Sequence, residues 1–177
     1  MKISINTATH EDIPSVAAFL SFARADMFPK LDPEWHRQKN ATELAAFAQT
    51  YLDTPDAVFL VAHDAGRNLI ATIAYLPYDD RFPELRLGRE GVVEVARLYV
   101  DAAFRRAGLA SNLVSLLEQR AREAGVRTLY LHTHPFLDGA IGFWERQGFV
   151  KLKVDDDPVW QTTHMSKRIA PHDAAVV

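Results

Sequence analysis

The chain has 177 residues, a length that suits one domain, and an apolar share of 48% is enough for a sizeable core. Its formal net charge of -3 argues against a general nucleic-acid binder, because such proteins carry a strongly basic surface. It has no cysteine, which excludes a disulfide scaffold, a thiolate zinc site and a cysteine nucleophile.

The N-terminal stretch MKISINTATHEDIP predicts a short strand and then a helix start. It turns polar within a few residues, unlike the apolar core of a signal peptide. Residues 2–6 alternate as a strand does, and Thr9 to Asp12 with Pro14 has the composition of a first helical turn. No apolar run in the chain approaches the roughly 18 residues of a membrane span. We therefore expect a cytoplasmic protein with no membrane partner.

The next segments predict a second helix and a hairpin. We expect Pro33 to interrupt the chain, and Asn40 or Thr42 to cap the second helix. Residues 57–63 and 69–76 have strand patterns and are joined by a short polar loop, which is typical of a hairpin. The charged stretch that follows, Tyr78 to Gly91, is broken by proline and glycine. It predicts a long loop, which either reads the substrate or is simply solvated.

The second half of the chain alternates strands and helices. In order, the pattern predicts a strand over 92–100, a helix ending at Gly125, a strand over 128–133, a helix over 138–147, and strands over 149–154 and 159–168. A strand, a helix and a strand in succession imply a right-handed parallel crossover. The chain thus predicts a mixed α/β (α+β) fold, with one domain over 1–170 and a frayed tail over 171–177.

The stretch FRRAGLASN marks the turn from a strand into a long helix. Unpaired N–H groups at a helix start, together with the helix dipole, bind phosphate. Gly108 has no side chain to block a ligand, and Arg105 and Arg106 add charge that suits phosphate oxygens. The Walker and three-glycine signatures are absent. The hexapeptide therefore predicts a pyrophosphate site, with a helix start flanked by solvated arginines as the alternative.

This stretch resembles the acetyl-coenzyme A loop of the GNAT N-acetyltransferases, Gln/Arg-x-x-Gly-x-Gly/Ala. Arg105-Arg106-Ala107-Gly108-Leu109-Ala110 begins five residues after Val100, which ends the strand LYV. Two later stretches, AIGFWERQGF and HMSKRI, are similar to further motifs of that family. The chain is thus identified as a member of the GNAT family from about Val92 onward, and its first half agrees in element order.

The resemblance implies a fold, a co-substrate and its binding residues. The fold is a central mixed, mostly antiparallel sheet of about seven strands flanked by helices, with a splayed parallel strand pair. The co-substrate is acetyl-CoA, whose pyrophosphate the loop would hold and whose pantetheine arm would pair with the strand backbone. The implied binding residues are Leu98, Tyr99, Val100, Arg105, Arg106, Ala107, Gly108, Leu109, Ala110, Ser111 and Trp144.

Glu94 is the candidate base for taking a proton from the acceptor amine. It stands in an apolar strand, at a position where members of the family carry their base. Burial is expected to raise its pKa into a useful range. The alternatives are a glutamate on an open face and one paired with Arg97.

The acid that protonates the leaving thiolate is less clearly marked. Trp144 stands where the family often has a tyrosine, and an indole N–H is not a useful acid, so Trp144 is expected to pack against the cofactor arm or fill the core. Tyr99 is the catalytic candidate in its place, with Tyr130, His132 and His134 as other substitutes. Coenzyme A thiolate is also a fair leaving group without a dedicated acid.

His132 and His134 lie on one face of a predicted strand and resemble half a metal site. A third ligand is not evident, so we expect no metal. The function implied is transfer of an acetyl group to a primary amine of a small molecule or protein. The alternative is a non-catalytic acyl-CoA-binding module. No nucleic-acid partner is expected, and a homodimer is one assembly left open.

Overall fold

The computed structural model describes residues 2–170, so the predicted tail over 171–177 lies outside the described residues. A seven-stranded sheet has the order β1-β2-β3-β4-β5-β7-β6. Its strands are β1 (Ser4–Thr7), β2 (Val58–His63), β3 (Leu69–Pro77), β4 (Val92–Val100), β5 (Thr128–Thr133), β6 (Val150–Val154) and β7 (Thr163–Arg168). β4 and β5 are parallel, whereas β1–β2, β5–β7 and β6–β7 are antiparallel. The predicted mixed sheet is confirmed.

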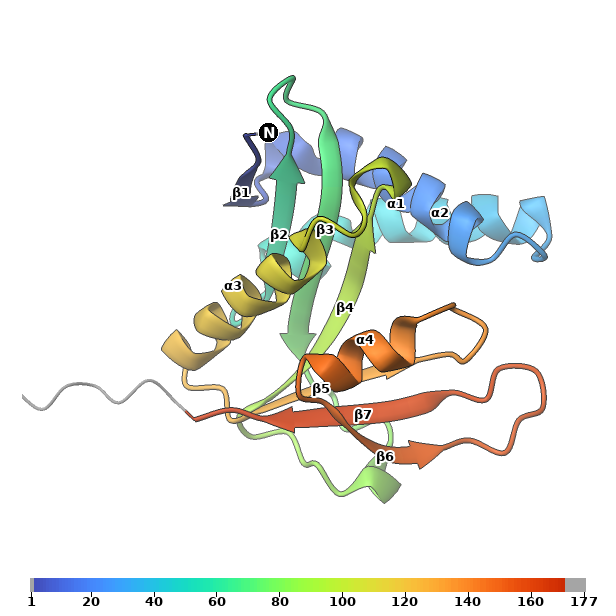
Figure 1. Cartoon of the computed structure of the whole chain (residues 1–177), viewed down its shortest axis with the longest axis vertical. Helices are drawn as coiled ribbons and strands as arrows, with labels where there is room; N and C mark the ends of the chain where they lie inside the picture. The colour runs from blue at the N-terminus through green and yellow to red at the C-terminus, as the bar shows by residue number, and fades with distance from the viewer. Residues whose placement is uncertain (1, 171–177) are drawn as a thin grey trace, which may run out of the picture. The chain divides into compact units, whose positions relative to one another are not determined.

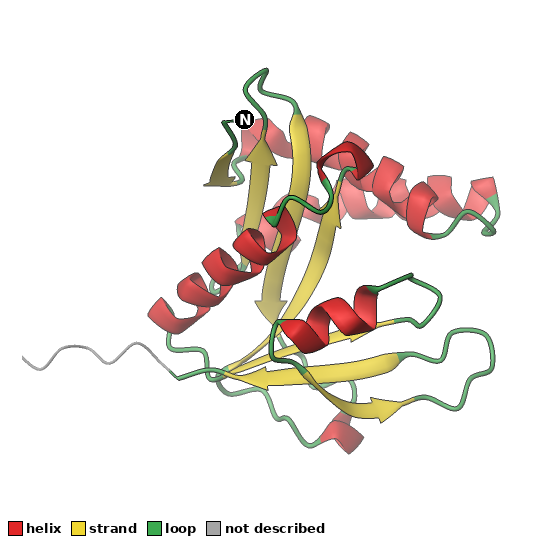
Figure 2. Ribbon diagram, viewed as in Figure 1, coloured by secondary structure: helices red, strands yellow, loops and turns green. Residues whose placement is uncertain are grey.

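Within the described residues, four α-helices and four short helical segments connect the strands, and Figure 2 shows the helices in red. The α-helices are α1 (Ile13–Met27), α2 (Pro33–Phe47), α3 (Leu109–Glu123) and α4 (Ala140–Arg146), and the short segments are η1 (His10–Asp12), η2 (Ala48–Leu52), η3 (Pro83–Leu85) and η4 (Ala102–Phe104). Within residues 2–170, none of these helices has the length and apolar character needed to cross a membrane.

Contacts group the chain into two compact units, each made of two separate stretches. Unit 1 consists of the described residues up to Ala74 together with Arg97–Leu113. Unit 2 consists of Tyr75–Ala96 and the described residues from Val114 onward. A single domain over 1–170 therefore stays a prediction, and each unit is described by itself below.

In unit 1, the two N-terminal helices begin by different devices. The predicted start of α1 is confirmed, because Thr9 and Asp12 form a capping box ahead of it. The predicted start of α2 is wrong. Asp32 caps this helix and Pro33 is its first residue, a position where the missing proline N–H costs nothing. Asn40 lies inside α2, and its amide donates to Ser21 on α1 at 2.6 Å, which helps to hold the two helices side by side (Figure 1).

Unit 1 also holds the C-terminal part of β4, where Arg97 has a left-handed backbone with φ of 60°. The hydroxyl of Thr72 donates to the Arg97 carbonyl at 2.8 Å. The Arg97 side chain donates to Tyr51 at 3.0 Å and pairs with Glu43 at 2.7 Å. A non-glycine residue in this conformation is strained and persists only when its surroundings hold it. These contacts hold the irregular strand that leads into Tyr99.

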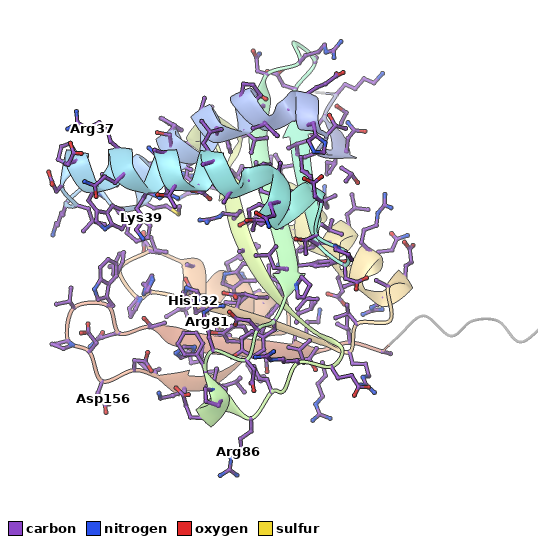
Figure 3. The ribbon with its side chains drawn as sticks, turned by 180° about the vertical axis from the view of Figure 1, so that it is seen from behind. Arg37, Lys39, Arg81, Arg86, His132 and Asp156 are labelled. Carbon is purple, nitrogen blue, oxygen red and sulfur yellow. The ribbon has the colours of Figure 1, made fainter. Side chains whose placement is uncertain are left out.

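Unit 2 packs different elements on the two faces of β5 and β7. Figure 1 shows α4 against one face, and Figure 3 shows the loop over 78–91 on the other. Under that loop, Tyr78, Val92 and Tyr130 form a buried apolar cluster. The parallel ladder pairs Glu94 with Tyr130, so these neighbours share the face that the loop covers. The long loop predicted from the sequence is confirmed, and its packing shows that it is more than a solvated segment.

Two predicted boundaries in unit 2 are wrong. Helix α4 begins at Ala140 rather than at residue 138, directly after Gly139, whose φ is 73°. Strand β7 begins at Thr163 rather than at residue 159. The residues before it form a turn in which the Asp157 carboxylate accepts from the N–H groups of Val159 and Trp160 at 2.9 and 2.7 Å. Local side-chain bonds of this kind compete with strand pairing.

Candidate functional site

The turn between β4 and α3 in unit 1 is built by backbone and capping bonds. The N–H of Asp101 donates to the Ile70 carbonyl on β3 at 2.8 Å, which ties the end of β4 to its neighbour. The Asp101 carboxylate then accepts from the Ala103 N–H at 2.9 Å, and the Phe104 N–H donates to the Asp101 carbonyl at 2.9 Å. These bonds set the direction in which the chain enters the loop.

The loop itself has the conformation that the anion-binding prediction requires. Arg106 and Gly108 have left-handed backbones with φ of 65° and 78°. A Cβ added at Gly108 would meet no atom within 4 Å, so the space beside this glycine is open. The first bond of α3 runs from the Asn112 N–H to the Gly108 carbonyl, which leaves the N–H groups of Leu109 and Ala110 without intrahelical acceptors. The loop therefore fits a pyrophosphate at the helix start.

The two arginines of the loop differ in their surroundings. The Arg105 side chain donates to the Val100 carbonyl at 2.9 Å and to the Asp26 carboxylate at 3.0 Å. Its guanidinium also lies 5.2 Å from the centre of the Tyr99 ring. Arg105 therefore braces the loop, whereas the side chain of Arg106 is exposed. The charge that both arginines were expected to offer a phosphate stays a prediction.

Tyr99 lies buried beside α1 in unit 1. Its hydroxyl donates to Asp26 at 2.8 Å, and the Phe19 ring meets its ring edge-on at 5.5 Å. Burial and then the hydrogen bond to Asp26 raise the pKa of Tyr99 to about 12. The hydrogen bonds from Tyr99 and Arg105 lower the pKa of Asp26. The hydroxyl is thus protonated at neutral pH, but its proton is already directed at a carboxylate.

Of the two residues expected to pair with a pantetheine arm, Leu98 is partly buried and Val100 is buried. The Val100 carbonyl already accepts from Arg105, which leaves one lone pair on that oxygen for a ligand. Trp144 belongs to unit 2, where its buried ring lies edge-on to Phe143 and Phe149, each at 5.1 Å. That packing favours the core interpretation of Trp144, and its contact with a cofactor stays a prediction.

Glu94 in unit 2 is a buried carboxylate held by two side chains. Arg81, from the loop over 78–91, donates to both of its oxygens at 2.5 and 2.6 Å. Nδ1 of His132 lies 3.1 Å from Oε1 of the same carboxylate. Figure 3 shows Arg81 and His132 close together on the face covered by the loop. The expected alternative of a pair with Arg97 is wrong, because Arg97 contacts Glu43 in unit 1.

The expected direction of the Glu94 pKa is also wrong. Burial alone would raise it, but the hydrogen bonds from His132 and Arg81 and the charge of Arg81 together lower it. The carboxylate is therefore ionised and fully engaged at neutral pH, and a base with a lowered pKa accepts protons poorly. The same contacts raise the pKa of Arg81 well above its usual range.

A second polar network in unit 2 was not anticipated from the sequence. The Tyr130 hydroxyl lies 2.8 Å from Nδ1 of His164, and Nε2 of His164 lies 3.2 Å from the Asp155 carboxylate. Both rings are fully buried, and burial raises the pKa of Tyr130 above its usual range. Lys153 pairs with Asp155 at 2.9 Å and closes the network. The one sequence signal related to this network is strand alternation, which places Tyr130 and His132 on the same face of β5.

The two histidines of β5 contact different partners. His132 contacts Glu94, whereas Nδ1 of His134 lies 3.2 Å from the Trp160 carbonyl. The His134 ring stacks on Phe136 at 5.1 Å, and burial lowers its pKa. Across residues 2–170 no three His, Asp or Glu side chains gather as a metal site would require. Each histidine has a partner of its own.

The chain is similar in sequence to known acetyltransferases. Residues 24–149 match the acetyltransferase (GNAT) family. Human N-acetyltransferase 8 is 29% identical over 119 residues, which are 67% of this chain and 50% of that protein. The chloroplastic GCN5-related N-acetyltransferase 4 of Arabidopsis thaliana is 34% identical over 97 residues, which are 54% of this chain and 32% of that protein. The chain thus spans half or less of the length of these relatives.

Solved structures show the same fold. A GNAT-family acetyltransferase from Staphylococcus aureus superposes with a TM-score of 0.74 at 18% identity, covering 94% of this chain and 99% of the other. The PaiA N-acetyltransferase of Thermoplasma acidophilum, solved in complex with coenzyme A, gives a TM-score of 0.71 at 20% identity, with 96% and 100% covered. At these identities the likeness concerns the fold.

Proposed function

Because the chain belongs to the GNAT acetyltransferase family, we propose that it transfers an acetyl group from acetyl-CoA to a primary amine of a small molecule or protein. The loop from Arg105 to Ala110 carries this proposal. Its open space beside Gly108 and its unpaired helix-start N–H groups suit the pyrophosphate of a coenzyme A thioester. The structure of the Thermoplasma relative contains coenzyme A, which supports the same ligand here.

The loop at the start of α3 and the strand before it would hold the co-substrate. Acetyl-CoA supplies a thioester whose acyl carbon a neutral amine can attack. The backbone from Arg106 to Ala110, with Ser111 in the first turn of α3, would bind the pyrophosphate. Strand residues Leu98 to Val100 would align the arm.

Glu94 and Tyr99 are the catalytic residues expected from the sequence, and both are held by neighbouring side chains. Arg81 and His132 contact the oxygens of Glu94, so Glu94 would accept a proton only by releasing one of these contacts. Tyr99 would serve as an acid only by releasing its hydrogen bond to Asp26.

Thiol release tests the proposal directly. Purified full-length chain is mixed with acetyl-CoA and a panel of amines: alkylamines, polyamines, amino acids, and peptides with free N-termini or lysines. Free thiol is followed with a colorimetric reagent, while calorimetry measures acetyl-CoA binding. Amine-dependent thiol release is expected. Binding without release from any amine would favour the non-catalytic acyl-CoA module, and no binding would overturn both functions.

The proposal also includes a homodimer and the cytoplasmic location expected from the sequence. The sheet order makes β6 an edge strand. Val150, Leu152 and Val154 on this strand are 61%, 41% and 49% exposed, which suits pairing with a second copy. Sedimentation at several concentrations would detect that homodimer, and Val150→Lys should weaken it. The cytoplasmic location expected from the sequence is tested by cell fractionation.

A further inference from the structure

We propose that His132 is the group that accepts the proton of the acceptor amine, and that Glu94 and Arg81 are positioning residues that hold its ring. This inference rests on the proposed function and deepens it, because it moves the base from the strand carboxylate to the imidazole beside it. It is carried by the geometry of three side chains of unit 2.

The Glu94 carboxylate has little capacity left for a substrate. Oε2 accepts from Nη1 of Arg81 at 2.5 Å, and Oε1 accepts from Nη2 at 2.6 Å. Such a bidentate arginine–carboxylate pair is among the strongest hydrogen-bonded arrangements in proteins. Oε1 also lies 3.1 Å from Nδ1 of His132. With 9% of its side chain exposed, Glu94 is poorly placed to meet a substrate amine.

The same contacts determine which nitrogen of His132 carries the hydrogen. An ionised carboxylate only accepts hydrogen bonds, so Nδ1 must be the donor. In a neutral imidazole the other nitrogen, Nε2, then carries a lone pair. A carboxylate that holds an imidazole in this tautomer is the arrangement that prepares a histidine base in hydrolase triads. Glu94 therefore orients the ring while Nε2 faces away from it.

Exposure separates His132 from the two other histidines near it. The His132 side chain is 37% exposed, so a substrate can reach it. His164 is fully buried, with both ring nitrogens engaged by Tyr130 and Asp155. His134 is partly buried, and its Nδ1 lies against the Trp160 carbonyl.

Charged and titratable groups surround His132 on several elements. From β4 the Glu94 carboxylate faces Nδ1, and from the loop over 78–91 Arg81 neutralises that carboxylate. The rings of Tyr130, His134 and His164 lie 6.5, 6.1 and 6.4 Å from the His132 ring. The negative charge of Glu94 and the positive charge of Arg81 thus both act on His132. The pH–rate profile must therefore be measured with both residues in place.

An ammonium R–NH₃⁺ gives one proton to Nε2 of His132, which leaves a lone pair on nitrogen that forms the new C–N bond as the C–S bond breaks. The nitrogen then loses a second proton, which the leaving thiolate takes up to become a thiol. Over the whole transfer, the ammonium and the thioester give an amide, a thiol and one proton. Nε2 passes that proton to solvent, so the ring returns to its starting state.

Two readouts test the inference. Long-range ¹H–¹⁵N NMR of the free protein reports the tautomer directly, and His132 is expected to carry its hydrogen on Nδ1, with Glu94→Gln weakening that preference. In thiol-release assays with the fastest amine of the panel, His132→Gln should lower kcat on the order of 10²–10⁴-fold. It should change the shape of the pH–rate profile, because the rate of the variant then follows deprotonation of the substrate ammonium in solution, and it should leave the acetyl-CoA Kd within about twofold. Glu94→Gln should lower kcat but keep the shape of the parent profile.

His10→Gln is the control outside the cluster, because the exposed His10 pairs with Asp53, and it should stay within about threefold of the parent kcat. His132→Ala provides a second variant, whose rate free imidazole should partly restore. An Nε2–H tautomer in the parent protein would overturn the inference, and so would a pH–rate profile of unchanged shape in His132→Gln. If no amine releases thiol from the parent protein, the proposed function fails and this role fails with it. If the parent protein releases thiol and His132→Gln has the same kcat, the proposed function stands and only the role of His132 is contradicted.

Discussion

The loop at the start of α3 and the cluster around Glu94 are built on opposite principles. The loop is made by backbone conformation, with left-handed residues at Arg106 and Gly108 and N–H groups at a helix end. The cluster is made by side chains of Arg81, Glu94 and His132, which stand on three separate segments. A site of the first kind follows from neighbours in the sequence. A site of the second kind exists only when the sheet register and a long loop bring its members together.

The largest effect is expected from breaking the backbone site. Gly108→Val places a β-branched residue at a φ of 78°. Strain of this kind costs about 1–3 kcal/mol. If the free loop relaxes to relieve it, binding must restore the strained conformation, and that cost converts to roughly 5- to 150-fold in the Kd for acetyl-CoA. Calorimetry measures the Kd of the parent and of the variant for acetyl-CoA. Gly88→Val is the matched control, since Gly88 has a φ of 70° and equally open surroundings in the other unit. Equal losses in both variants would show that general destabilisation, not the loop, is responsible.

The next effect concerns the side-chain cluster. Arg81→Gln removes both bonds to Glu94, and because the Arg81 side chain is 40% exposed we expect a loss of only about 1–2 kcal/mol in unfolding free energy at pH 7. The pKa of Glu94 is lowered in the folded parent. The stability that ionised Glu94 contributes is therefore present above its unfolded pKa of about 4.3. It is lost as pH falls through the pKa of Glu94 in the folded protein.

Urea unfolding of the parent and Arg81→Gln proteins between pH 7 and pH 3 measures this difference. The difference in unfolding free energy between the two proteins should decrease at acid pH. Protonation of Glu94 removes from the parent the ion pair that the variant already lacks. Arg86→Gln is the control in the same loop, since Figure 3 shows Arg86 directed away from the molecule. A gap that stays constant with pH would show that the Arg81–Glu94 pair contributes no charge-dependent stability.

An effect of similar size is expected at Trp144, where the sequence departs from the family motif. Trp144→Tyr replaces a buried indole between Phe143 and Phe149 with a smaller ring. Lost packing should lower the unfolding free energy by about 1–2 kcal/mol, with no gain in kcat per folded molecule. Melting temperature and kcat are measured on one preparation. A stable variant with a clearly higher kcat would contradict the core interpretation and show that a hydroxyl at this position serves the reaction.

The smallest effect is expected at Tyr99. Tyr99→Phe removes the hydroxyl that donates to Asp26, while Arg105 still pairs with that carboxylate. The pKa of Asp26 should rise, because the Tyr99 bond is the main cause of its lowered value. We expect kcat within about threefold of the parent, measured with saturating acetyl-CoA. A loss of a hundredfold or more would establish Tyr99 as the acid for the leaving thiolate.

Local chemistry determined what the sequence alone could predict. The capping box at Thr9 and Asp12, the mixed order of strands and helices, and the loop around Gly108 all depend on residues close together in the chain. Their conformations follow from backbone preferences and helix-end hydrogen bonding, which act over a few residues. The resemblance to the GNAT family rested on motifs of this kind, and the family match over residues 24–149 confirms it.

Tertiary structure decided the rest, because the partner of a buried side chain depends on which distant segment covers it. Glu94 was expected to have a raised pKa through burial, and the opposite holds because Arg81 reaches it from the loop over 78–91 and His132 from the adjacent strand. The Tyr130–His164–Asp155 network likewise needs the antiparallel pairing of β5 with β7. Charge and hydrogen bonding act over a few ångströms of space, and that distance is set by the sheet register rather than by position in the chain.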